Sequence, residues 1–289
     1  LFIFYNMKTC QITHLNVPII DVIKEMGGER KKNEDYYLEN LCFAKAKQIY
    51  GDCLPKEVSD RLKYELKIIK HRGASGYFLF LQDVVNAVQS ELGIWIGPGR
   101  GTAAGCLVCY CLGITKIDPL KFDLLFERFL NPDGIMFPDI DIDTENEGRE
   151  RIMSWLEQKY GKECCAHIAK GKECLHLCGV VVANKPIANL APISTLSVKV
   201  PSGSQTTLNC VQYDDIESSG LIKFDFADFE TLTQMKEICD LVKMKEGKPA
   251  TCSDHTTAIF RCSGCKTLIT IQLSGEHDIA DAELKRHEP

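Results

Sequence analysis

Apolar residues in the first third of the chain recur at helical spacing in two stripes. The first stripe consists of Leu38, Leu41, Ala44 and Ile49, and the second of Val58, Leu62, Leu66 and Ile69. Gly51 marks a break between them. The pattern predicts a mainly helical region over residues 21–90, with an apolar-faced helix from Tyr77 to Leu92 at its end.

Later segments alternate between strand and helix patterns. Strand patterns occupy residues 94–96, 135–142, 180–182 and 221–226, and helix patterns occupy residues 103–112, 150–160 and 231–244. The polar stretch 245–256 is typical of a linker. This mixture predicts a sheet with helices packed on it.

Composition and charge narrow the class of protein. The chain has 289 residues, which favours about two domains, and 45% of them are hydrophobic, which is enough for a core. The net charge is -6, so any basic footprint for nucleic acid must be local. Leu1–Tyr5 is too short for a signal peptide, and no segment could span a membrane, so we expect a cytoplasmic protein.

Fifteen cysteines are many for a chain of this size. Disulfide-rich proteins are typically small and secreted, whereas several of these cysteines lie in apolar runs such as residues 105–112. Free cysteine behaves as a small buried hydrophobe. We therefore expect mostly reduced cysteines in the core, with a disulfide-rich protein as the alternative.

A group of basic residues decorates the second helical stripe. Its members are Arg61, Lys63, Lys67 and Lys70. They are typical of a solvated helix face, and contact with a phosphate backbone is the alternative.

The segment from Pro138 to Asp143 alternates aspartate with isoleucine. In a strand, Asp139, Asp141 and Asp143 would share one face. Carboxylates this close repel one another unless cations lie between them, and Mg²⁺ prefers oxygen ligands. A second strand pattern places Lys223 and Asp225 on one face. The alternative is an exposed edge strand with a polar face, although aspartate is poor strand composition.

A glycine-rich turn, residues 97–105, follows the predicted strand at 94–96. Glycine permits tight turns and close backbone approach, and Arg100 offers a donor fork for phosphate oxygens. We expect Thr102 to cap the helix that follows. The turn predicts a phosphate site, with a plain strand–helix connection as the alternative.

These motifs, in this order, resemble the alpha subunit of bacterial DNA polymerase III, the C family of DNA polymerases. The resemblance spans roughly residues 36–289 and is carried by the segments 76–79, 97–105, 118–132, 138–143, 176–180 and 220–225. It implies an α+β fold: a polymerase-beta-like nucleotidyltransferase palm, a mixed sheet with flanking helices, plus helical segments.

The resemblance also implies roles for individual residues. It matches Asp139, Asp141 and Asp225 to catalytic aspartates that bind two Mg²⁺ ions, and it matches nucleotide-binding positions to Gly99, Arg100, Gly101, Thr102, Arg128 and Lys223. The implied reaction is attack of a primer 3′-hydroxyl on a deoxynucleoside triphosphate. The implied partners are a DNA primer–template, the dNTP and other replisome subunits.

The resemblance suggests three regions. Residues 1–75 form a helical lead-in, residues 76–228 the palm, and residues 229–289 the start of a fingers-like helical segment. The family's thumb, which grips the duplex, is missing near residues 163–175. We therefore predict a shortened polymerase with weak or undetectable activity on its own. The alternative is a non-catalytic remnant that binds DNA or a replisome partner.

Cysteine and histidine spacing raises a third hypothesis, a small zinc-bearing interaction module. One set of ligand types comprises Cys252, His255, Cys262 and Cys265, and another comprises Cys164, Cys165, His167, Cys174, His176 and Cys178. The six-residue gap between the first pairs is short, and the second set lies where the thumb is missing. Both facts argue against zinc.

Overall fold

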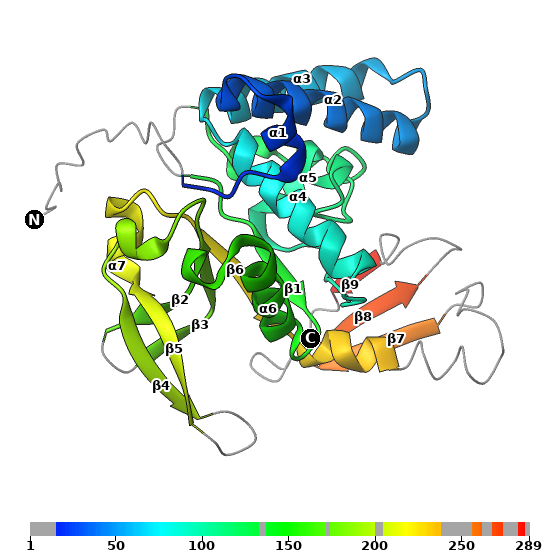
Figure 1. The fold of residues 1–289 in the computed structure, drawn as a ribbon. Helices are drawn as coiled ribbons and strands as arrows, with labels where there is room; N and C mark the ends of the chain where they lie inside the picture. Colours follow the sequence, from blue (N-terminus) through cyan, green and yellow to red (C-terminus); the bar gives the residue numbers. More distant parts are fainter. Residues whose placement is uncertain are drawn as a thin grey trace, which may run out of the picture.

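The computed structural model describes residues 16–132, 137–171, 174–199, 205–237, 256–261, 268–273 and 283–286. In Figure 1, a group of helices lies above a six-stranded sheet. The helices are α1 Asp21–Met26, α2 Arg30–Tyr50, α3 Lys56–His71 and α4 Ser75–Ser90. They confirm the predicted helical region, and α2 ends at the glycine that the sequence marked as a break, Gly51.

Helix α4 forms the centre of the core. Its sequence is apolar on nearly all sides, as expected for a helix that is buried all round. The Tyr77 ring stacks on Phe224 of the sheet with centroids 5.5 Å apart, and the Phe80 ring lies 4.5 Å from the same ring. On its other side α4 packs against α2. Figure 1 shows α4 between the α2–α3 pair and the sheet.

The six-stranded sheet has the order β1-β6-β3-β2-β5-β4. Its strands are β1 Asp141–Thr144, β2 Cys165–Lys170, β3 Cys174–Val182, β4 Ser194–Lys199, β5 Gln205–Gln212 and β6 Lys223–Asp228. The β1–β6 and β2–β5 pairs are parallel and the other pairs are antiparallel. The mixed sheet with flanking helices is therefore present as expected.

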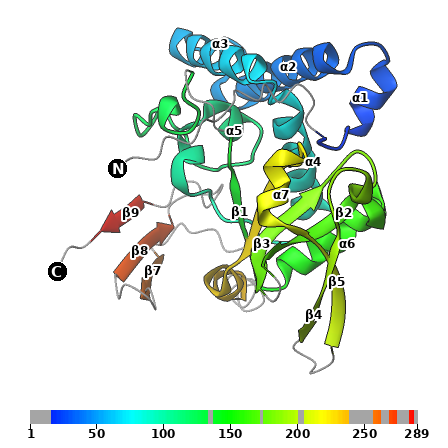
Figure 2. The same cartoon turned by 90° about the vertical axis from the view of Figure 1, so that its left-hand side faces the viewer.

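The two faces of the sheet carry different cores. Ile142, Val180 and Phe224 belong to the main core on the face that helix α6, Gly148–Tyr160, covers. Ile168 and Val211 belong to a smaller core on the other face, where the short helix α7, Tyr213–Ser218, packs (Figure 2). The carboxylates lie on this second face, beyond the part that α7 covers. Single-turn 3₁₀ helices are η3 Lys162–Cys164 and η4 Ile187–Asn189.

Three expected elements have different bounds. The strand predicted from residue 135 begins only at Asp141, and residues 133–136 lie outside the described residues. Residues 94–96 contribute a single β-bridge, Ile96 to Thr144, instead of a strand. The helix predicted over residues 103–112 is two pieces, 3₁₀ helix η1 Gly101–Gly105 and helix α5 Leu107–Cys111. Extended backbone at Cys106 separates them.

The C-terminal region differs from the expected helical segment. Residues 230–237 are helical, in agreement with the pattern, and residues 238–255, with most of the predicted linker, lie outside the described residues. Strands β7 Thr256–Arg261, β8 Leu268–Leu273 and β9 Glu283–Arg286 form an antiparallel sheet. The helical expectation for these strands is wrong, because β7 and β8 are rich in threonine and isoleucine, which favour strands.

Two general expectations can be compared with the described part of the chain. Within it, no helix has the length and apolar character needed to cross a bilayer. The described cysteines are free, and most are buried, as predicted for reduced core residues: Cys42, Cys106, Cys109, Cys111, Cys164, Cys165 and Cys210.

Candidate functional site

Two aspartates from distant parts of the chain lie side by side on the sheet. Asp141 of β1 and Asp225 of β6 are direct partners in the parallel pairing. Their strands are fixed in this register because the alternate residues, such as Ile142 and Phe224, are buried in the main core. The predicted convergence of two carboxylate segments is therefore present in the structure.

Lys223 joins Asp139 to this pair. Its Nζ lies 3.5 Å from Asp139 Oδ1 and also pairs with Asp225. The exposed fraction of the carboxylate side chains rises from 7% at Asp225 through 30% at Asp141 to 61% at Asp139. The cluster thus runs from a buried floor to an exposed rim.

One oxygen of the buried aspartate has no hydrogen-bond partner among the described residues. This atom is Asp225 Oδ1. His176 Nε2 lies 3.7 Å away, which is too far for a hydrogen bond. Buried polar atoms are nearly always paired, so this oxygen is a candidate ligand atom for a cation.

The charges around the site are not balanced. Burial raises the pKa of Asp141, the charge of Arg100 opposes this rise, and the nearby charges of Asp139 and Asp225 add to it. Burial lowers the pKa of Lys223, but its hydrogen bond and charge interaction with Asp225 outweigh burial, so that this pKa is raised overall. The cluster therefore favours additional positive charge.

The glycine turn docks directly against β1. The N–H of Gly97 donates to the carbonyl oxygen of Asp143 at 2.8 Å. A Cβ at Gly97 would lie 3.1 Å from Asp143 Cβ, so glycine permits this close approach. Gly99 and Gly101 have φ of 101° and 66°, which favour glycine. The turn reaches the carboxylates because of these glycines.

Arg100, at the centre of the turn, bridges two of the aspartates. Its Nη1 lies 2.8 Å from Asp141 Oδ2, and its Nε lies 2.8 Å from Asp143 Oδ1. The side chain remains 45% exposed. It is therefore accessible to a ligand that approaches from solvent.

Two other predicted nucleotide-binding residues are placed differently. Thr102 does not cap a helix: η1 begins at Gly101, Arg100 is its N-cap residue, and no side chain caps it. The capping prediction fails because the helix begins at Gly101, two residues earlier than expected. Arg128 is exposed on 3₁₀ helix η2, Phe126–Arg128, and no contact described for the carboxylates includes it.

A buried ion pair behind the turn was not predicted. Arg61 donates from Nη2 to the carbonyl oxygens of Gly105 and Leu124, each at 2.9 Å, and pairs with Glu65 at 2.7 Å. Glu65, which is fully buried, accepts from the N–H groups of Leu107 and Val108 at 3.0 and 2.9 Å. Arg61 is thus a partly buried residue whose side chain binds the protein's own backbone and Glu65, rather than a member of a solvated or phosphate-binding face. The i,i+4 spacing of Arg61 and Glu65 is the sequence signal that could have found the ion pair, although not its backbone partners.

His176 is a second residue whose position was not anticipated. Strand β3 places it beside Asp225, and an edge-to-face contact joins its ring to Tyr213 with centroids 5.9 Å apart. Gly179, the register partner of Asp225, leaves room for it, because a Cβ there would lie 2.7 Å from His176 Cδ2. Only the spatial pairing of β3 with β6 reveals this neighbourhood.

The donor set fits a hard divalent cation. Carboxylate oxygens are the ligands that Mg²⁺ prefers, and the unpartnered Asp225 oxygen together with the raised pKa of Asp141 marks a place for positive charge. Among the described residues, no three Asp, Glu, His or Cys side chains already form a metal-binding group. Arg100 and Lys223 supply positive charge to the carboxylates instead.

Of the two sets of possible zinc ligands, only the second lies among the described residues, and there it does not support the zinc hypothesis. Cys252, His255, Cys262 and Cys265 all lie outside the described residues. In the other set, Cys164 and Cys165 are buried, His167 Nδ1 lies 2.9 Å from Arg149 Nη2, and His176 faces Asp225.

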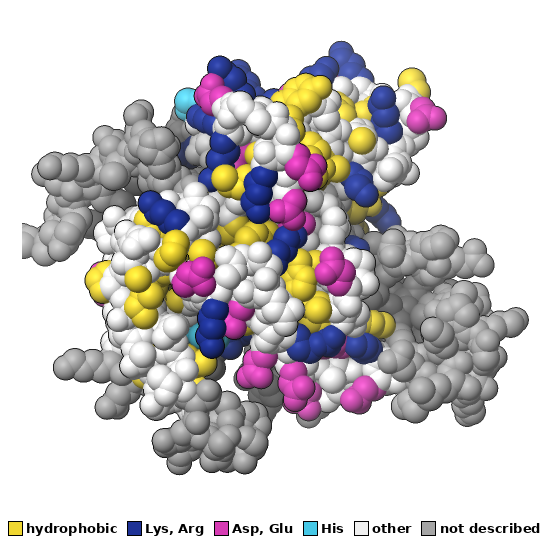
Figure 3. All heavy atoms as spheres, in the orientation of Figure 1, with side chains coloured by type: hydrophobic (Ala, Val, Ile, Leu, Met, Phe, Trp, Pro, Cys, Tyr) yellow, Lys and Arg dark blue, Asp and Glu magenta, His cyan; other side chains and the backbone are white. Residues whose placement is uncertain are grey.

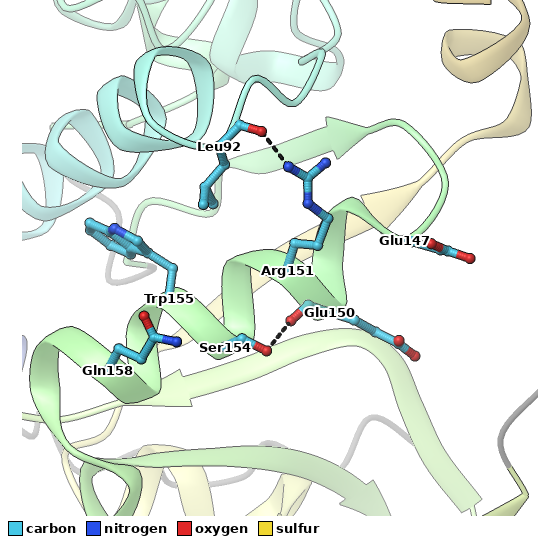
Figure 4. A pocket seen from close by; sticks show the side chains of 7 residues that line it. All are labelled: Leu92, Glu147, Glu150, Arg151, Ser154, Trp155 and Gln158. Carbon is cyan, nitrogen blue, oxygen red and sulfur yellow. Dashed lines mark hydrogen bonds between the residues drawn. The ribbon is translucent and has the colours of Figure 1, made fainter.

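The rest of the surface offers a shallow hollow separate from the carboxylates. It measures about 390 Å³ and lies on α6 (Figure 4), lined by Leu92, Glu147, Glu150, Arg151, Ser154, Trp155 and Gln158. Arg151 points across it to the carbonyl of Leu92. Figure 3 shows basic and acidic side chains interspersed on the face drawn, without one continuous basic stripe.

Comparisons with known proteins give one consistent family. The model of the bacterial DNA polymerase III alpha NTPase domain matches residues 36–174. The DNA polymerase III subunit alpha of Staphylococcus aureus is 47% identical over 122 residues, which are 42% of this chain and 10% of the relative. The same subunit of Halalkalibacterium halodurans is 45% identical over 138 residues, 48% of this chain and 12% of the relative. The matched part thus spans about a tenth of the length of these relatives.

Proposed function

We propose that this chain carries the palm of a DNA-directed DNA polymerase, because residues 36–174 match the model of the bacterial DNA polymerase III alpha NTPase domain. The reaction would be attack of a primer 3′-hydroxyl on the α-phosphate of a dNTP, with release of pyrophosphate. The observation that carries the proposal is the parallel register of Asp141 and Asp225 beside Asp139. The proposal places the chain in the cytoplasm, where bacterial DNA is replicated.

Asp139, Asp141 and Asp225 are the residues proposed to hold two Mg²⁺ ions. When bound, Mg²⁺ stabilises the negative charge that develops on the attacking and leaving oxygens. Asp225 would contribute its unpartnered Oδ1 from the buried floor, and Asp139 its exposed carboxylate from the rim. Lys223 would hold Asp139 and Asp225 in orientation through its two contacts.

The glycine turn is proposed to hold the triphosphate. Arg100 can exchange a carboxylate for phosphate oxygens because its side chain is half-exposed, and its planar fork suits such bidentate contact. Gly99 and Gly101 allow the backbone to approach a phosphate closely. Thr102 and Arg128 are both exposed and therefore accessible to the same ligand.

One observation favours a second candidate, a remnant that binds DNA or a replisome partner without sustained synthesis. β2 ends at Lys170 and β3 begins at Cys174, so only three residues join them. The family resemblance places a thumb in this part of the chain. Without it we expect nucleotide binding but weak extension of a primer.

Thermal unfolding with dATP and Mg²⁺ tests the proposed site. A ligand at 100 times its Kd stabilises the folded state by about 2.7 kcal/mol, so the melting temperature should rise. Asp141→Asn should remove this rise without unfolding the protein, and Asp60→Asn, an exposed aspartate of α3, should retain it. If the wild-type chain gains no stability, or if Asp141→Asn gains as much, the proposed site is wrong.

Two further measurements separate the candidate functions. Primer extension with Mg²⁺ should give short products in low yield, and long products in high yield would contradict the remnant. Metal analysis of the purified chain should give no stoichiometric zinc. One zinc per chain would revive the interaction module.

A further inference from the structure

The carboxylate face of the sheet continues beyond Asp225 as a second surface. His176 lies next to Asp225, the Tyr213 ring contacts His176, and Lys170 Nζ lies 4.7 Å from the centre of the Tyr213 ring. Tyr213 is 42% exposed, and Lys170 is also exposed. We call these three residues, His176, Lys170 and Tyr213, the Tyr213 surface. It is a continuous path from the buried carboxylate to an exposed aromatic ring and a cation.

Strand register explains why this surface faces the same way as the carboxylates. Ile168 of β2 pairs with His176 and with Val211 of β5, so these residues share one face. Lys170 follows Ile168 by two residues within β2. Alternation along β2 therefore returns the Lys170 side chain to the face that carries Asp225. Tyr213 is the first residue of α7, directly after β5, and the contact of its ring with His176 places it at the same face.

A cavity of about 320 Å³ lies beside the Tyr213 ring, lined by Ala169, Lys170, Gly171, Gln212, Tyr213 and Asp214. The Gln212 amide is held in place by donation to the carbonyl of Gly171 at 3.2 Å. Among the residues that line the cavity, Lys170 and the Tyr213 ring are the groups suited to bind a nucleic-acid strand, whereas the Asp214 carboxylate would repel a phosphate. Aromatic rings stack on nucleic-acid bases, and lysine binds the phosphate backbone.

The direction of the proposed reaction assigns an occupant to this surface. Arg100 and the glycine turn lie against β1, whereas the Tyr213 surface lies across β6, on the other side of the carboxylates. In an in-line displacement, the attacking and leaving oxygens lie on opposite sides of the phosphorus. If the triphosphate lies at the glycine turn, the strand that bears the attacking hydroxyl approaches from the side of β3, β2 and β5.

We propose that the Tyr213 surface binds the 3′-terminal part of the primer strand, with the Tyr213 ring stacking on a base or sugar and Lys170 contacting a backbone phosphate. This inference rests on the proposed polymerase function. It gives the primer strand a binding surface on the sheet itself. Only three residues join β2 to β3, in the part of the chain where the family resemblance places a thumb.

The test is binding of a fluorescent primer–template to the full chain, measured by anisotropy at several salt concentrations without dNTP. Tyr213→Ala should weaken binding about tenfold with an unchanged salt dependence, and Tyr213→Phe should restore it. Lys170→Ala should reduce the slope of log K against log salt by about one, and Lys170→Arg should restore it. Tyr36→Ala and Lys24→Ala, which change exposed residues of α2 and α1, are the controls and should bind as wild type.

A parallel measurement with dATP and Mg²⁺ distinguishes this inference from the proposed function. The Tyr213 and Lys170 variants should keep the thermal stabilisation by nucleotide. Variants that bind DNA as tightly as wild type, or a wild-type chain that binds nucleotide but no DNA, would overturn the inference and leave the proposed function standing. Loss of nucleotide binding in the wild type would overturn both.

Photocross-linking tests whether the primer or the template strand of the DNA lies at the Tyr213 surface. A 4-thiothymidine at the primer terminus should cross-link to the peptide that contains Tyr213. Cross-linking to this peptide only from the template strand would overturn the assignment to the primer.

Discussion

Individual side chains around Asp225 determine how the candidate site is held. Asp225 is buried, one of its oxygens is unpartnered, and the missing side chain of Gly179 leaves the space that His176 occupies. A group buried this deeply can be displaced only by moving its neighbours. Small changes in volume here should therefore affect ligand binding as well as stability.

Gly179→Ala tests the space beside Asp225. The added Cβ would lie 2.7 Å from both His176 Cδ2 and Ile168 Cδ1, so we expect a loss of about 1–3 kcal/mol in the free energy of unfolding. Urea denaturation measures it, and stabilisation by dATP and Mg²⁺ should fall in parallel. Ile168→Val removes one of the two clashing atoms and should partly rescue the variant. An unchanged unfolding midpoint in Gly179→Ala would contradict this packing.

His167 should make stability depend on pH. Burial, and secondarily the charge of Arg149, lowers its pKa to about 4. Below the ordinary pKa the unfolded chain takes up a proton that the folded chain does not, so stability is present above pH 6.5 and is lost as the pH falls. Between pH 7.5 and pH 5 this loss should be about 2 kcal/mol.

Urea denaturation at these two pH values measures the effect of His167. His167→Gln should reduce the difference, whereas His71→Gln, which changes an exposed histidine at the end of α3, should leave it unchanged. Equal pH dependence in the wild type and in His167→Gln would show that other groups cause it.

Among the elements, helix α3 and the glycine turn act as one unit. Arg61 and Glu65 of α3 bind the end of η1 and the start of α5, so the turn that carries Arg100 is held from behind. Glu65 also explains why a new helix begins at Leu107, since its carboxylate accepts from the first N–H groups of α5.

Glu65→Ala should be strongly destabilising. It leaves two buried N–H groups and the partly buried Arg61 without their carboxylate, a change that costs about 3–5 kcal/mol. Chemical denaturation measures this loss, and Glu57→Ala, an acidic residue in the first turn of the same helix, is the control. Glu57→Ala should stay within about 0.5 kcal/mol of wild type. Similar costs for the two variants would contradict a special role for Glu65.

The sequence predicted those helices and strands in which apolar side chains recur at regular helical or strand spacing. Helices α2 to α4 and the pairing face of β1 and β6 belong to this group, and the two strands include Asp141 and Asp225, whereas Asp139 lies two residues before β1. The break at Cys106 was not predictable, since it depends on Glu65, 41 residues earlier. The position of His176 beside Asp225 was also not predictable, because it depends on the pairing of β3 with β6, which are far apart in the sequence.

For the whole molecule, the charge and the short β2–β3 connection bear on the proposed binding of DNA. The net charge is -6, and acidic and basic side chains are interspersed on the face shown in Figure 3. Under the proposed function we expect few phosphate contacts to a duplex, and therefore a low affinity at physiological salt.

Insertion of a relative's thumb segment tests this limit. Placed between Gly171 and Cys174, it should tighten primer–template binding at least tenfold and lengthen the primer-extension products, because it adds phosphate contacts. A Gly/Ser insert of equal length is the control and should change neither. If the thumb chimaera folds but binds DNA no better than the control, the proposed lack of a thumb does not limit DNA binding by this chain.

The place of β6 in the sheet has a consequence for synthesis of the chain on the ribosome. β6 is the last of the six strands to be made, yet it lies between β1 and β3 and is the strand that pairs with β1. A nascent chain that stops before Lys223 leaves β1 without its neighbour in the sheet and lacks one of the three aspartates. Competence to bind nucleotide should thus appear abruptly, when the ribosome has released residues 223–228, rather than grow in stages as the polypeptide lengthens.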